Sequence, residues 1–305
     1  MRRVAGIDCG TNSIRLLIAD VDDEGRLHDV VRRMEVVRLG EGVDVTGRLS
    51  AAALERTRSA LADYTAQIRD HGVAAVRMVA TSASRDAANA DEFTAMVASV
   101  LGTAPEVISG DEEARLSFTG AAATLPEPAG QRLLVDIGGG STEFVRGTGE
   151  EVAAAMSVDV GCVRMTERHL RSDPPAAGEI EAAAADVRAI VDGALRAVDP
   201  GRSAVELVAV AGTATTIAGI ALGLPAYDAD AIDGTTLSYE QVAKVTADLI
   251  AVDHAARLAI PVMHPGRADV IVGGALVLRT IMERSGADAV VVSEHDILDG
   301  IALSA

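Results

Sequence analysis

Aromatic residues are nearly missing from this sequence: they make up 2% of its 305 residues, and tryptophan is absent. The hydrophobic residues, 49% of the chain, are mostly Ala, Val, Ile and Leu instead. A core built from such aliphatic side chains is expected where helices pack on buried sheets. The length suits one large domain or two ordinary ones.

Long apolar runs are lacking as well, since no run reaches the roughly 20 residues that a membrane-spanning helix needs. Arg2 and Arg3 precede an apolar stretch, which superficially resembles a secretory signal peptide. Asp8, Asn12 and Arg15 interrupt that stretch too early for a signal sequence. We therefore expect a soluble, cytoplasmic protein with no membrane partner.

Cysteine and lysine are scarce too. The spacing of Cys9 and Cys162 fits neither a metal motif nor a disulfide framework. Lys244 is the only lysine, so nearly every fixed cation is an arginine. The forked guanidinium suits phosphate oxygens, although a GC-rich genome would produce the same bias. The net charge of −18 argues against nucleic acid as a partner, and a polyanionic ligand would need cations gathered locally.

Hydrophobic periodicity predicts alternating strands and helices in both halves of the chain. In the first half we expect strands at Val4–Cys9, Ile14–Val21, Leu27–Leu39, Ala75–Ala80 and Glu106–Ile108, and helices at Ser50–His71, Asp91–Leu101 and Gly110–Ala123. Residues 125–130, rich in Pro and Gly, indicate a linker. Beyond it we expect strands at Arg132–Ile137, Thr142–Arg146, Val152–Ser157, Leu207–Ala211 and Ala289–Val292, and helices at Val163–Leu170, Gly178–Val198, Tyr239–Ala251, Ala268–Arg284 and Asp296–Leu303.

The second half repeats a unit of the first. Residues 6–13, GIDCGTNS, align with residues 134–141, LVDIGGGS, and each segment is a strand followed by Asp-x-Gly-x-x-Ser and another strand. Two copies of one supersecondary unit imply duplicated domains that face each other. We predict two α/β domains, residues 1–125 and 126–305, with a ligand cleft between them.

The two repeated loops are candidate phosphate sites. Glycine lets backbone N–H groups approach an anion, and hydroxyl and amide side chains add donors. The donors would come from Gly10, Thr11, Asn12, Ser13, Gly138, Gly139, Gly140, Ser141 and Thr142. Asp8 and Asp136, at the strand ends, could hold Mg²⁺ together with substrate phosphates. The alternative is a pair of ordinary glycine-rich hairpin turns.

A third candidate loop contains Gly212 and Thr213, after a strand and at the start of a helix, where anions bind readily. A helix that is capped by Thr213 and binds no anion would have the same sequence pattern. No Gly-Lys-Ser/Thr sequence occurs, which excludes a P-loop nucleotide site.

Two Asp-x-Gly loops followed by a Gly-Thr loop resemble the actin, Hsp70 and sugar-kinase superfamily, which has a ribonuclease H-like fold. Within it the chain is most similar to the exopolyphosphatase / guanosine pentaphosphate phosphohydrolase (Ppx/GppA) family. The matching segments occur in family order: residues 6–15, 80–85 (ATSASR), 108–115 (ISGDEEAR), 135–143 and 160–164 (VGCVR). The resemblance covers essentially the whole chain and implies two actin-like domains.

Catalytic roles follow from this resemblance. It implies that Glu113 activates water, that Glu143 is a second catalytic glutamate, and that Arg85 binds phosphate. Glu112, by contrast, completes a Ser109-x-x-Glu112 capping-box pattern. Taken alone, Glu113 and Glu143 could each be solvated carboxylates. Arg164 and Arg267 are weaker candidates for a substrate contact, and each could equally form a surface ion pair.

The family implies an exopolyphosphatase and favours a homodimer. We expect Mg²⁺ as the cofactor, and the sequence leaves open both Mn²⁺ in its place and a need for a monovalent cation. Longer members carry an additional helical domain, so we expect a preference for short polyphosphates. The family's Gly-Leu-Arg-Glu-Gly is replaced here by Asp296-Ile297-Leu298-Asp299-Gly300, so no substrate-binding role carries over to this segment. The alternatives are removal of the 5′-phosphate from guanosine pentaphosphate, a non-catalytic nucleotide or polyphosphate sensor, and a kinase with a second acceptor.

Overall fold

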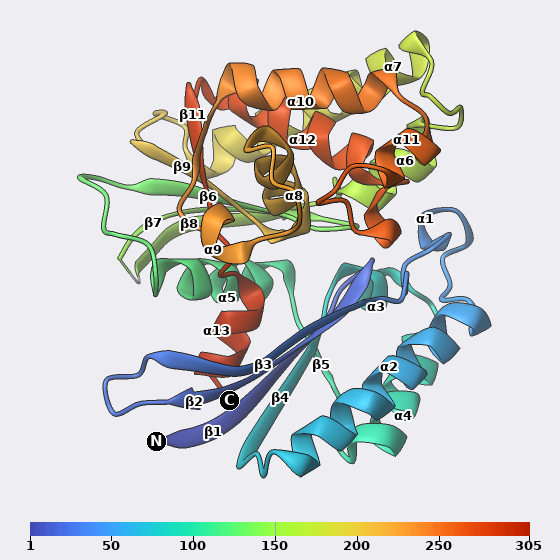
Figure 1. The fold of residues 1–305 in the computed structure, drawn as a ribbon, viewed down its shortest axis with the longest axis vertical. Coiled ribbons are helices and arrows are strands. Elements are labelled where there is room, and N and C mark those ends of the chain that lie inside the picture. Colours follow the sequence, from blue (N-terminus) through green and yellow to red (C-terminus); the bar gives the residue numbers. More distant parts are fainter. Residues whose placement is uncertain (150) are drawn as a thin grey trace. The chain divides into compact units, whose positions relative to one another are not determined.

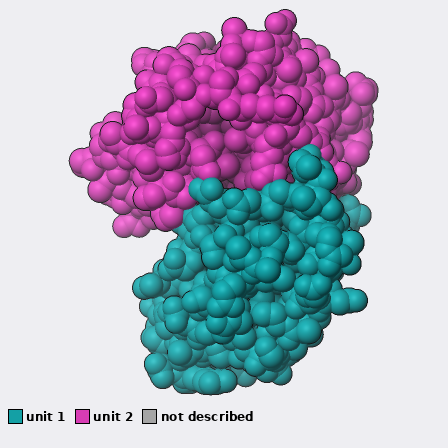
Figure 2. Space-filling view, turned by 90° about the vertical axis from the view of Figure 1, so that its right-hand side faces the viewer, with its two compact units in different colours: residues 1–123, 296–305 teal, residues 124–295 magenta. Residues whose placement is uncertain are grey.

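The chain forms two compact units in a computed structural model that describes residues 1–149 and 151–305. Unit 1 comprises Met1–Ala123 and Asp296–Ala305, and unit 2 comprises Thr124–His295 (Figure 2). The division therefore falls two residues before the expected one, and residues 296–305 lie in unit 1, whereas the sequence analysis placed them in the second domain. Every described helix is too short or too polar to span a lipid bilayer.

Unit 1 contains one sheet with helices on both of its faces (Figure 1). Its strands are β1 (Arg2–Cys9), β2 (Ser13–Val21), β3 (Leu27–Val36), β4 (Ala75–Ala80) and β5 (Glu106–Val107). Its helices are α1 (Val43–Thr46), α2 (Ala51–Asp70), α3 (Ser82–Asp86), α4 (Ala90–Leu101), α5 (Gly110–Ala122) and α13 (Ile297–Leu303).

The strand order in unit 1 is β3-β2-β1-β4-β5. The first three strands are antiparallel neighbours, and β1, β4 and β5 run parallel. Alternate residues of β1 and β2 enter different cores: Ile7 and Leu16 pack with α2 and α4, while Val4 and Leu17 pack against Leu298 of α13. This period of two is what a strand buried on both faces requires.

Helix α13 belongs to unit 1 because its apolar side chains fill the second face of that sheet. Leu298 and Ala302 join the core made by β1 and β2, and Ile297 and Ile301 pack with Leu116 of α5. The two helices cross at glycines: a Cβ on Gly120 would lie 1.9 Å from the carbonyl oxygen of Asp296, and one on Gly300 would lie 2.1 Å from that of Leu116. No larger residue fits at this crossing.

Unit 2 repeats the architecture on a larger scale. Its strands are β6 (Arg132–Ile137), β7 (Thr142–Thr148), β8 (Glu151–Val158), β9 (Glu206–Val210), β10 (Thr236–Ser238) and β11 (Ala289–Val292). Its helices are α6 (Cys162–His169), α7 (Ala177–Val198), α8 (Ala211–Ala221), α9 (Ala229–Ile232), α10 (Tyr239–Ala251), α11 (His254–Leu258), the 3₁₀ helix η1 (Pro265–Arg267) and α12 (Ile271–Ser285).

The order of the described strands in unit 2 is β10-β11-β9-β6-β7-β8. Strands β6, β7, β8, β9 and β11 match β1, β2, β3, β4 and β5 in order and direction, and β10 adds an antiparallel edge strand. The predicted duplication of an α/β unit is therefore confirmed. The predicted cleft between the two units stays a prediction.

Local differences from the expected elements are confined to short segments. Strand β10 and helices α1, α3, α9 and α11 were not predicted, because three to five residues give too little periodicity to recognise. Strand β9 ends at Val210, one residue earlier than expected, and Ala211 begins α8 with a φ of 68°. Positive φ is costly for alanine, so the turn into α8 is strained.

Candidate active site

The two duplicated loops have the same backbone turn. In the first, the N–H of Gly10 donates to the carbonyl of Ser13 at 2.9 Å, and in the second the N–H of Gly138 donates to that of Ser141 at 3.0 Å. A Cβ on Gly138 would lie 3.1 Å from this carbonyl oxygen, which is tighter than an ordinary contact. At Gly138 the missing side chain therefore permits the close turn, whereas at Gly10 a Cβ would lie 3.5 Å from the carbonyl oxygen of Ser13, an ordinary contact. Phosphate binding by these loops stays a prediction.

The first loop is held on one side by residues that follow β3. The carbonyl of Asn12 accepts from the N–H groups of Val37 and Arg38, and that of Thr11 accepts from Gly40 at 2.8 Å. The hydroxyl of Thr11 shares a hydrogen bond with that of Ser82 at 2.8 Å. Thr11 is thereby tied to α3, the helix that carries Arg85.

The second loop rests on the start of α6. The carbonyls of Gly138 and Gly139 accept from the backbone N–H groups of Cys162, Val163 and Arg164, which are among the first donors of that helix. A Cβ on Gly161 would lie 2.5 Å from the carbonyl oxygen of Gly139, so only glycine permits this approach.

Side chains near the second loop modify two expectations. The hydroxyl of Thr142, expected to donate to phosphate, donates to the carbonyl of Val160 at 2.6 Å. A hydroxyl has a single donor, so in this arrangement Thr142 supports the loop instead. Nε of Arg164 donates to the carbonyl of Gly140 at 2.7 Å, which places this arginine directly on the loop.

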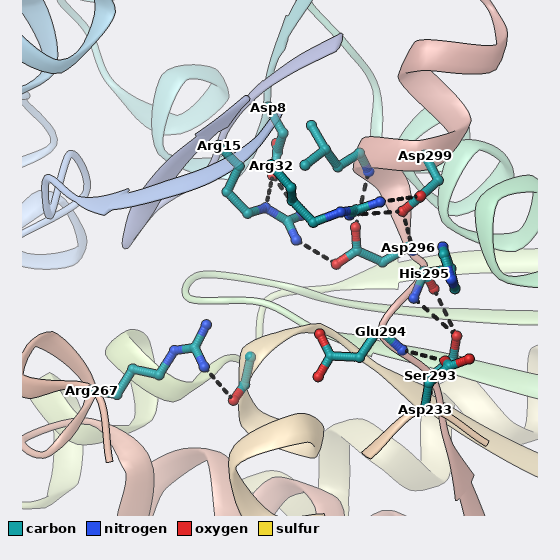
Figure 3. Close-up of polar contacts among 12 residues, drawn as sticks. Asp8, Arg15, Arg32, Asp233, Arg267, Ser293, Glu294, His295, Asp296 and Asp299 are labelled. Atoms are coloured by element: carbon teal, nitrogen blue, oxygen red, sulfur yellow. Dashed lines mark hydrogen bonds and ion pairs between the residues drawn. The ribbon is translucent and has the colours of Figure 1, made fainter. Parts of the chain in front are cut away.

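The Gly212-Thr213 segment is helical, because α8 begins at Ala211, so Thr213 is not the cap. Nη1 of Arg267 donates to the carbonyl of Gly212 at 3.1 Å and to the hydroxyl of Thr216 at 3.0 Å. A Cβ on Gly212 would lie 2.2 Å from Nη2 of Arg267. This helix start thus carries a guanidinium packed against its glycine. Figure 3 shows Arg267 with one of its hydrogen bonds.

Glu113 and Arg85 form a buried ion pair in unit 1. Nη1 of Arg85 donates to Oε2 of Glu113 at 2.7 Å and to the carbonyl of Ile108 at 3.0 Å. Arg85 lies in the last turn of α3. Only 8% of the surface of Glu113 is exposed. Burial raises the pKa of Glu113 to about 7, although Arg85 opposes that rise.

The neighbouring Glu112 has a different environment. The hydroxyl of Ser109 accepts from the N–H of Glu112 at 3.2 Å, which is half of the predicted capping box. The carboxylate of Glu112 accepts from Nη2 of Arg77 at 2.6 Å instead of returning to the cap. Two adjacent glutamates at one helix start thus occupy a surface ion pair and a buried site.

The duplicated aspartates face opposite kinds of partner. On β2, Arg15 is the register partner of Asp8, whereas on β7 Glu143 is the register partner of Asp136. Nε and Nη2 of Arg15 both donate to Oδ2 of Asp8, at 3.0 and 2.7 Å (Figure 3). Oδ1 of Asp8 is buried and has no hydrogen-bond partner among the described residues. Burial raises the pKa of Asp8, the guanidinium of Arg15 opposes this, and the charge of Asp296 adds to it.

In unit 2 the paired positions both carry carboxylates. Oε1 of Glu143 accepts from the hydroxyl of Ser157 at 2.7 Å, and 1% of the residue's surface is exposed. Asp136 is 5% exposed. Opposite residues on antiparallel strands point to the same face, so the two carboxylates are neighbours, which favours a nearby cation.

These acidic groups are compatible with a magnesium ion. In the described part of the chain, His, Cys, Asp and Glu side chains do not gather in threes or more as a complete metal cage would require. Magnesium commonly binds through one or two carboxylates together with substrate phosphates and water. The unsatisfied Oδ1 of Asp8 is an oxygen of the required kind.

The sequence analysis missed the acidic residues at the start of α13. Asp296 caps the helix, its Oδ1 accepting from the N–H of Leu298 at 3.0 Å, and its Oδ2 accepts from Nη1 of Arg15. Asp299 accepts from Nη2 of Arg32 at 2.5 Å. The Asp296-x-x-Asp299 spacing marks a helix start in sequence, but nothing in it indicates arginines more than 260 positions away.

The model of the Ppx/GppA phosphatase family matches residues 17–305. The chain belongs to this family. Exopolyphosphatase 2 of Mycobacterium tuberculosis is 51% identical over 316 aligned positions, covering 100% of this chain and 98% of the relative. A bifunctional 3-dehydroquinate synthase/phosphatase of Fusobacterium nucleatum is 31% identical, and the aligned region covers 98% of this chain and 46% of that relative.

Solved structures give the same family. The crystal structure of an exopolyphosphatase-like protein is 44% identical, with a TM-score of 0.94 over 99% of this chain and 97% of that one. The Ppx/GppA family member of Aquifex aeolicus is 31% identical, with a TM-score of 0.83 over 99% and 97%. The family resemblance drawn from the sequence motifs is confirmed, and with it the α/β architecture.

Proposed function

We propose that this protein is an exopolyphosphatase, which hydrolyses the terminal phosphoanhydride bond of inorganic polyphosphate. The observation that carries the proposal is the buried Glu113, whose pKa is about 7 and whose carboxylate is held by Arg85. A base of this pKa is half ionised near neutral pH, which suits proton transfer from water. Membership of the Ppx/GppA family and the exopolyphosphatase name of a half-identical relative support the substrate.

In the proposed reaction, Glu113 accepts a proton from the attacking water as its oxygen bonds to the terminal phosphorus. The bond from that phosphorus to the bridging oxygen breaks, and the shortened chain leaves with that oxygen. Glu143, held by Ser157, would orient the water or a bound cation. Most of the catalysis of phosphoryl transfer is positioning and charge stabilisation, which these fixed groups can supply.

Terminal phosphates would bind to the two duplicated loops. We assign backbone N–H groups of Gly10–Ser13 and Gly138–Ser141 to phosphate oxygens, with Arg85 as a charged donor and the start of α8 at Gly212 as a further site. Arg267 and Arg164 support this assignment, because each guanidinium packs against backbone of a proposed phosphate-binding segment. Thr142 is assigned to loop support.

The divalent cation would be held by Asp136 and Asp8 together with substrate phosphates. When bound, Mg²⁺, or Mn²⁺ in its place, neutralises charge on the transferred phosphate. Oδ1 of Asp8 and the carboxylate pair Asp136–Glu143 are the groups that support this assignment. A monovalent cation, a cytoplasmic location and a homodimer remain part of the proposal. Light scattering of the purified protein and cell fractionation test the last two.

The deciding experiment compares phosphate release from triphosphate, a short and a long polyphosphate, guanosine pentaphosphate and ATP. Glu113→Gln is compared with the matched control Glu112→Gln, which alters only the surface pair with Arg77. Fast release from polyphosphate, lost in Glu113→Gln and kept in Glu112→Gln, supports the proposal. Phosphate release mainly from guanosine pentaphosphate would make that compound the substrate. No phosphate release from any of the five compounds would contradict the proposed enzymatic activity.

The same panel tests the expected preference for short chains. Rates that fall from triphosphate and short polyphosphate to long polyphosphate agree with it. Rates that rise steadily with chain length contradict it without affecting the assignment of Glu113.

A further inference from the structure

The guanidinium of Arg15 is shared between two buried carboxylates of unit 1. Its Nε and Nη2 donate to Oδ2 of Asp8, and its Nη1 donates to Oδ2 of Asp296 (Figure 3). The side chains of Asp8 and Asp296 are 7% and 3% exposed, and that of Arg15 is 18% exposed. Contacts between such buried charges are screened little by solvent.

The sharing decides which oxygens of Asp8 are occupied. An arginine paired with one carboxylate commonly forms two parallel bonds, one to each oxygen. Here both bonds go to Oδ2, and Oδ1 of Asp8 stays buried with no hydrogen-bond partner among the described residues. The third guanidinium nitrogen is held on the other side by Asp296, which keeps Arg15 from turning to cover both oxygens of Asp8.

The sharing also changes the local charge. Arg15 alone would neutralise Asp8, whereas one guanidinium between Asp8 and Asp296 leaves a net charge of −1. A buried site of net negative charge, with an open carboxylate oxygen, attracts a cation.

Asp296 is itself fixed by the start of α13. Its Oδ1 accepts from the N–H of Leu298 at 3.0 Å, and its own N–H donates to Oδ2 of Asp299 at 3.0 Å. Asp299 is in turn bound by Arg32 of β3, at 2.5 Å from Nη2. The cap therefore holds the carboxylate of Asp296 in one orientation toward Arg15.

We propose that Asp296 is a positioning residue for the divalent cation: it holds Arg15 on one oxygen of Asp8 and keeps the other oxygen available as a ligand. This inference rests on the proposed function, because it takes Asp8 as a ligand of the cation that accompanies polyphosphate. Residues 296–300 depart from the family motif, and this inference gives the first of them, Asp296, a role in the metal site.

The test measures Mn²⁺ binding without substrate, by electron paramagnetic resonance titration of the whole protein. The variants are Asp296→Asn, Asp8→Asn and the matched control Asp253→Asn, in which the substituted aspartate caps helix α11 of unit 2 by accepting from the N–H of Ala256. Asparagine keeps the helix-capping oxygen and removes the charge. Loss of a group that orients a metal ligand typically weakens metal binding by about 10- to 100-fold. We expect a loss of that size in Asp296→Asn and less than about twofold in Asp253→Asn.

Apparent affinity for Mg²⁺ in phosphate release should fall with it, while kcat at saturating Mg²⁺ changes less. If Asp296→Asn binds Mn²⁺ as tightly as the wild type and only its melting temperature falls, then Asp296 serves solely as a helix cap and the inference is overturned. Unchanged affinity in Asp8→Asn would overturn it at its premise, while the Glu113 comparison still tests the hydrolase separately. If Asp296→Asn does not fold, Asp296→Ser, which also caps helices, takes its place.

Discussion

Nη1 of Arg85 lies 2.7 Å from Oε2 of Glu113, so the proposed base is held by the arginine that is proposed to bind phosphate. The two residues come from different helices, α3 and α5, and 28 positions separate them in sequence. Arg85 lowers the pKa of Glu113, but burial dominates and leaves that pKa at about 7. In the proposed mechanism, the pair would couple phosphate binding at Arg85 to the protonation state of Glu113.

Glu113→Gln should lower kcat for phosphate release by about 10²- to 10⁴-fold, the usual contribution of a general base. Glutamine keeps the length and an oxygen that can accept from Arg85, so the affinity for polyphosphate should change little. Stopped-flow phosphate release and equilibrium binding measure the two quantities. If the Glu113→Gln protein keeps its activity, Glu113 is not the catalytic base.

The pH dependence of kcat/KM should show an acidic arm near pH 7. Glu113 must be ionised to accept a proton, and burial raises the pKa of the free enzyme to about 7, so kcat/KM rises as pH increases through that value. Initial rates from pH 5.5 to 8.5 at fixed ionic strength give the profile. An arm at pH 4 to 5 would mean that the base is a more exposed carboxylate.

Arg85→Gln should move this acidic arm to higher pH. The guanidinium lowers the pKa of Glu113, and without it only the hydrogen bond from Thr81 opposes the effect of burial, so a higher pH is needed to ionise the base. The absolute rate falls as well, because a phosphate ligand is lost, but only the pH shift reports on the pairing. Arg77→Gln, which removes the partner of Glu112, is the control and should leave the arm in place.

The stability of the protein should also depend on pH through the raised pKa of Glu113. Between pH 4.5 and about 7 the folded state keeps a proton on Glu113 that the unfolded chain has released, so this residue's contribution to the free energy of unfolding falls as pH rises. Glutamine does not titrate. The melting temperature of the wild type relative to Glu113→Gln should therefore decrease from pH 5 to pH 8, measured by scanning calorimetry. A constant difference would place the pKa of Glu113 near its ordinary value.

Gly120→Ala should destabilise unit 1. The added Cβ would lie 1.9 Å from the carbonyl oxygen of Asp296, so α5 and α13 would have to separate. Overpacking of this kind costs about 1–3 kcal/mol or more. Gly193→Ala in α7 is the control: the nearest atom lies 4.0 Å away, and alanine is favoured over glycine by roughly 0.5–1 kcal/mol within a helix. Thermal denaturation compares the two, and equal melting temperatures would contradict the close crossing.

The sequence predicts most of the fold because the central strands are short, nearly continuous apolar runs bounded by turn residues, and because the duplicated motif repeats in register. Asp8 and Asp136 could be proposed as cation ligands for the same reason, since each lies at the end of a buried strand before a glycine turn. The proposed role of Asp296 could not be predicted in this way. Its partner Arg15 is 281 positions away, and a seven-residue helix such as α13 can pack on either sheet. The hydroxyl of Thr142 was misassigned because sequence does not show which carbonyl lies nearest, and here that is Val160.

Because residues 296–305 complete unit 1, the order of synthesis matters for folding. The ribosome makes the strands of the first sheet, then all 172 residues of unit 2 from Thr124 to His295, and only afterwards helix α13. Until then Val4, Leu17 and Ala19 lack the apolar cover of Leu298 and Ala302. Unit 2 is a continuous segment, whereas the part of the first sheet that α13 covers cannot be buried until the last ten residues of the sequence have been made.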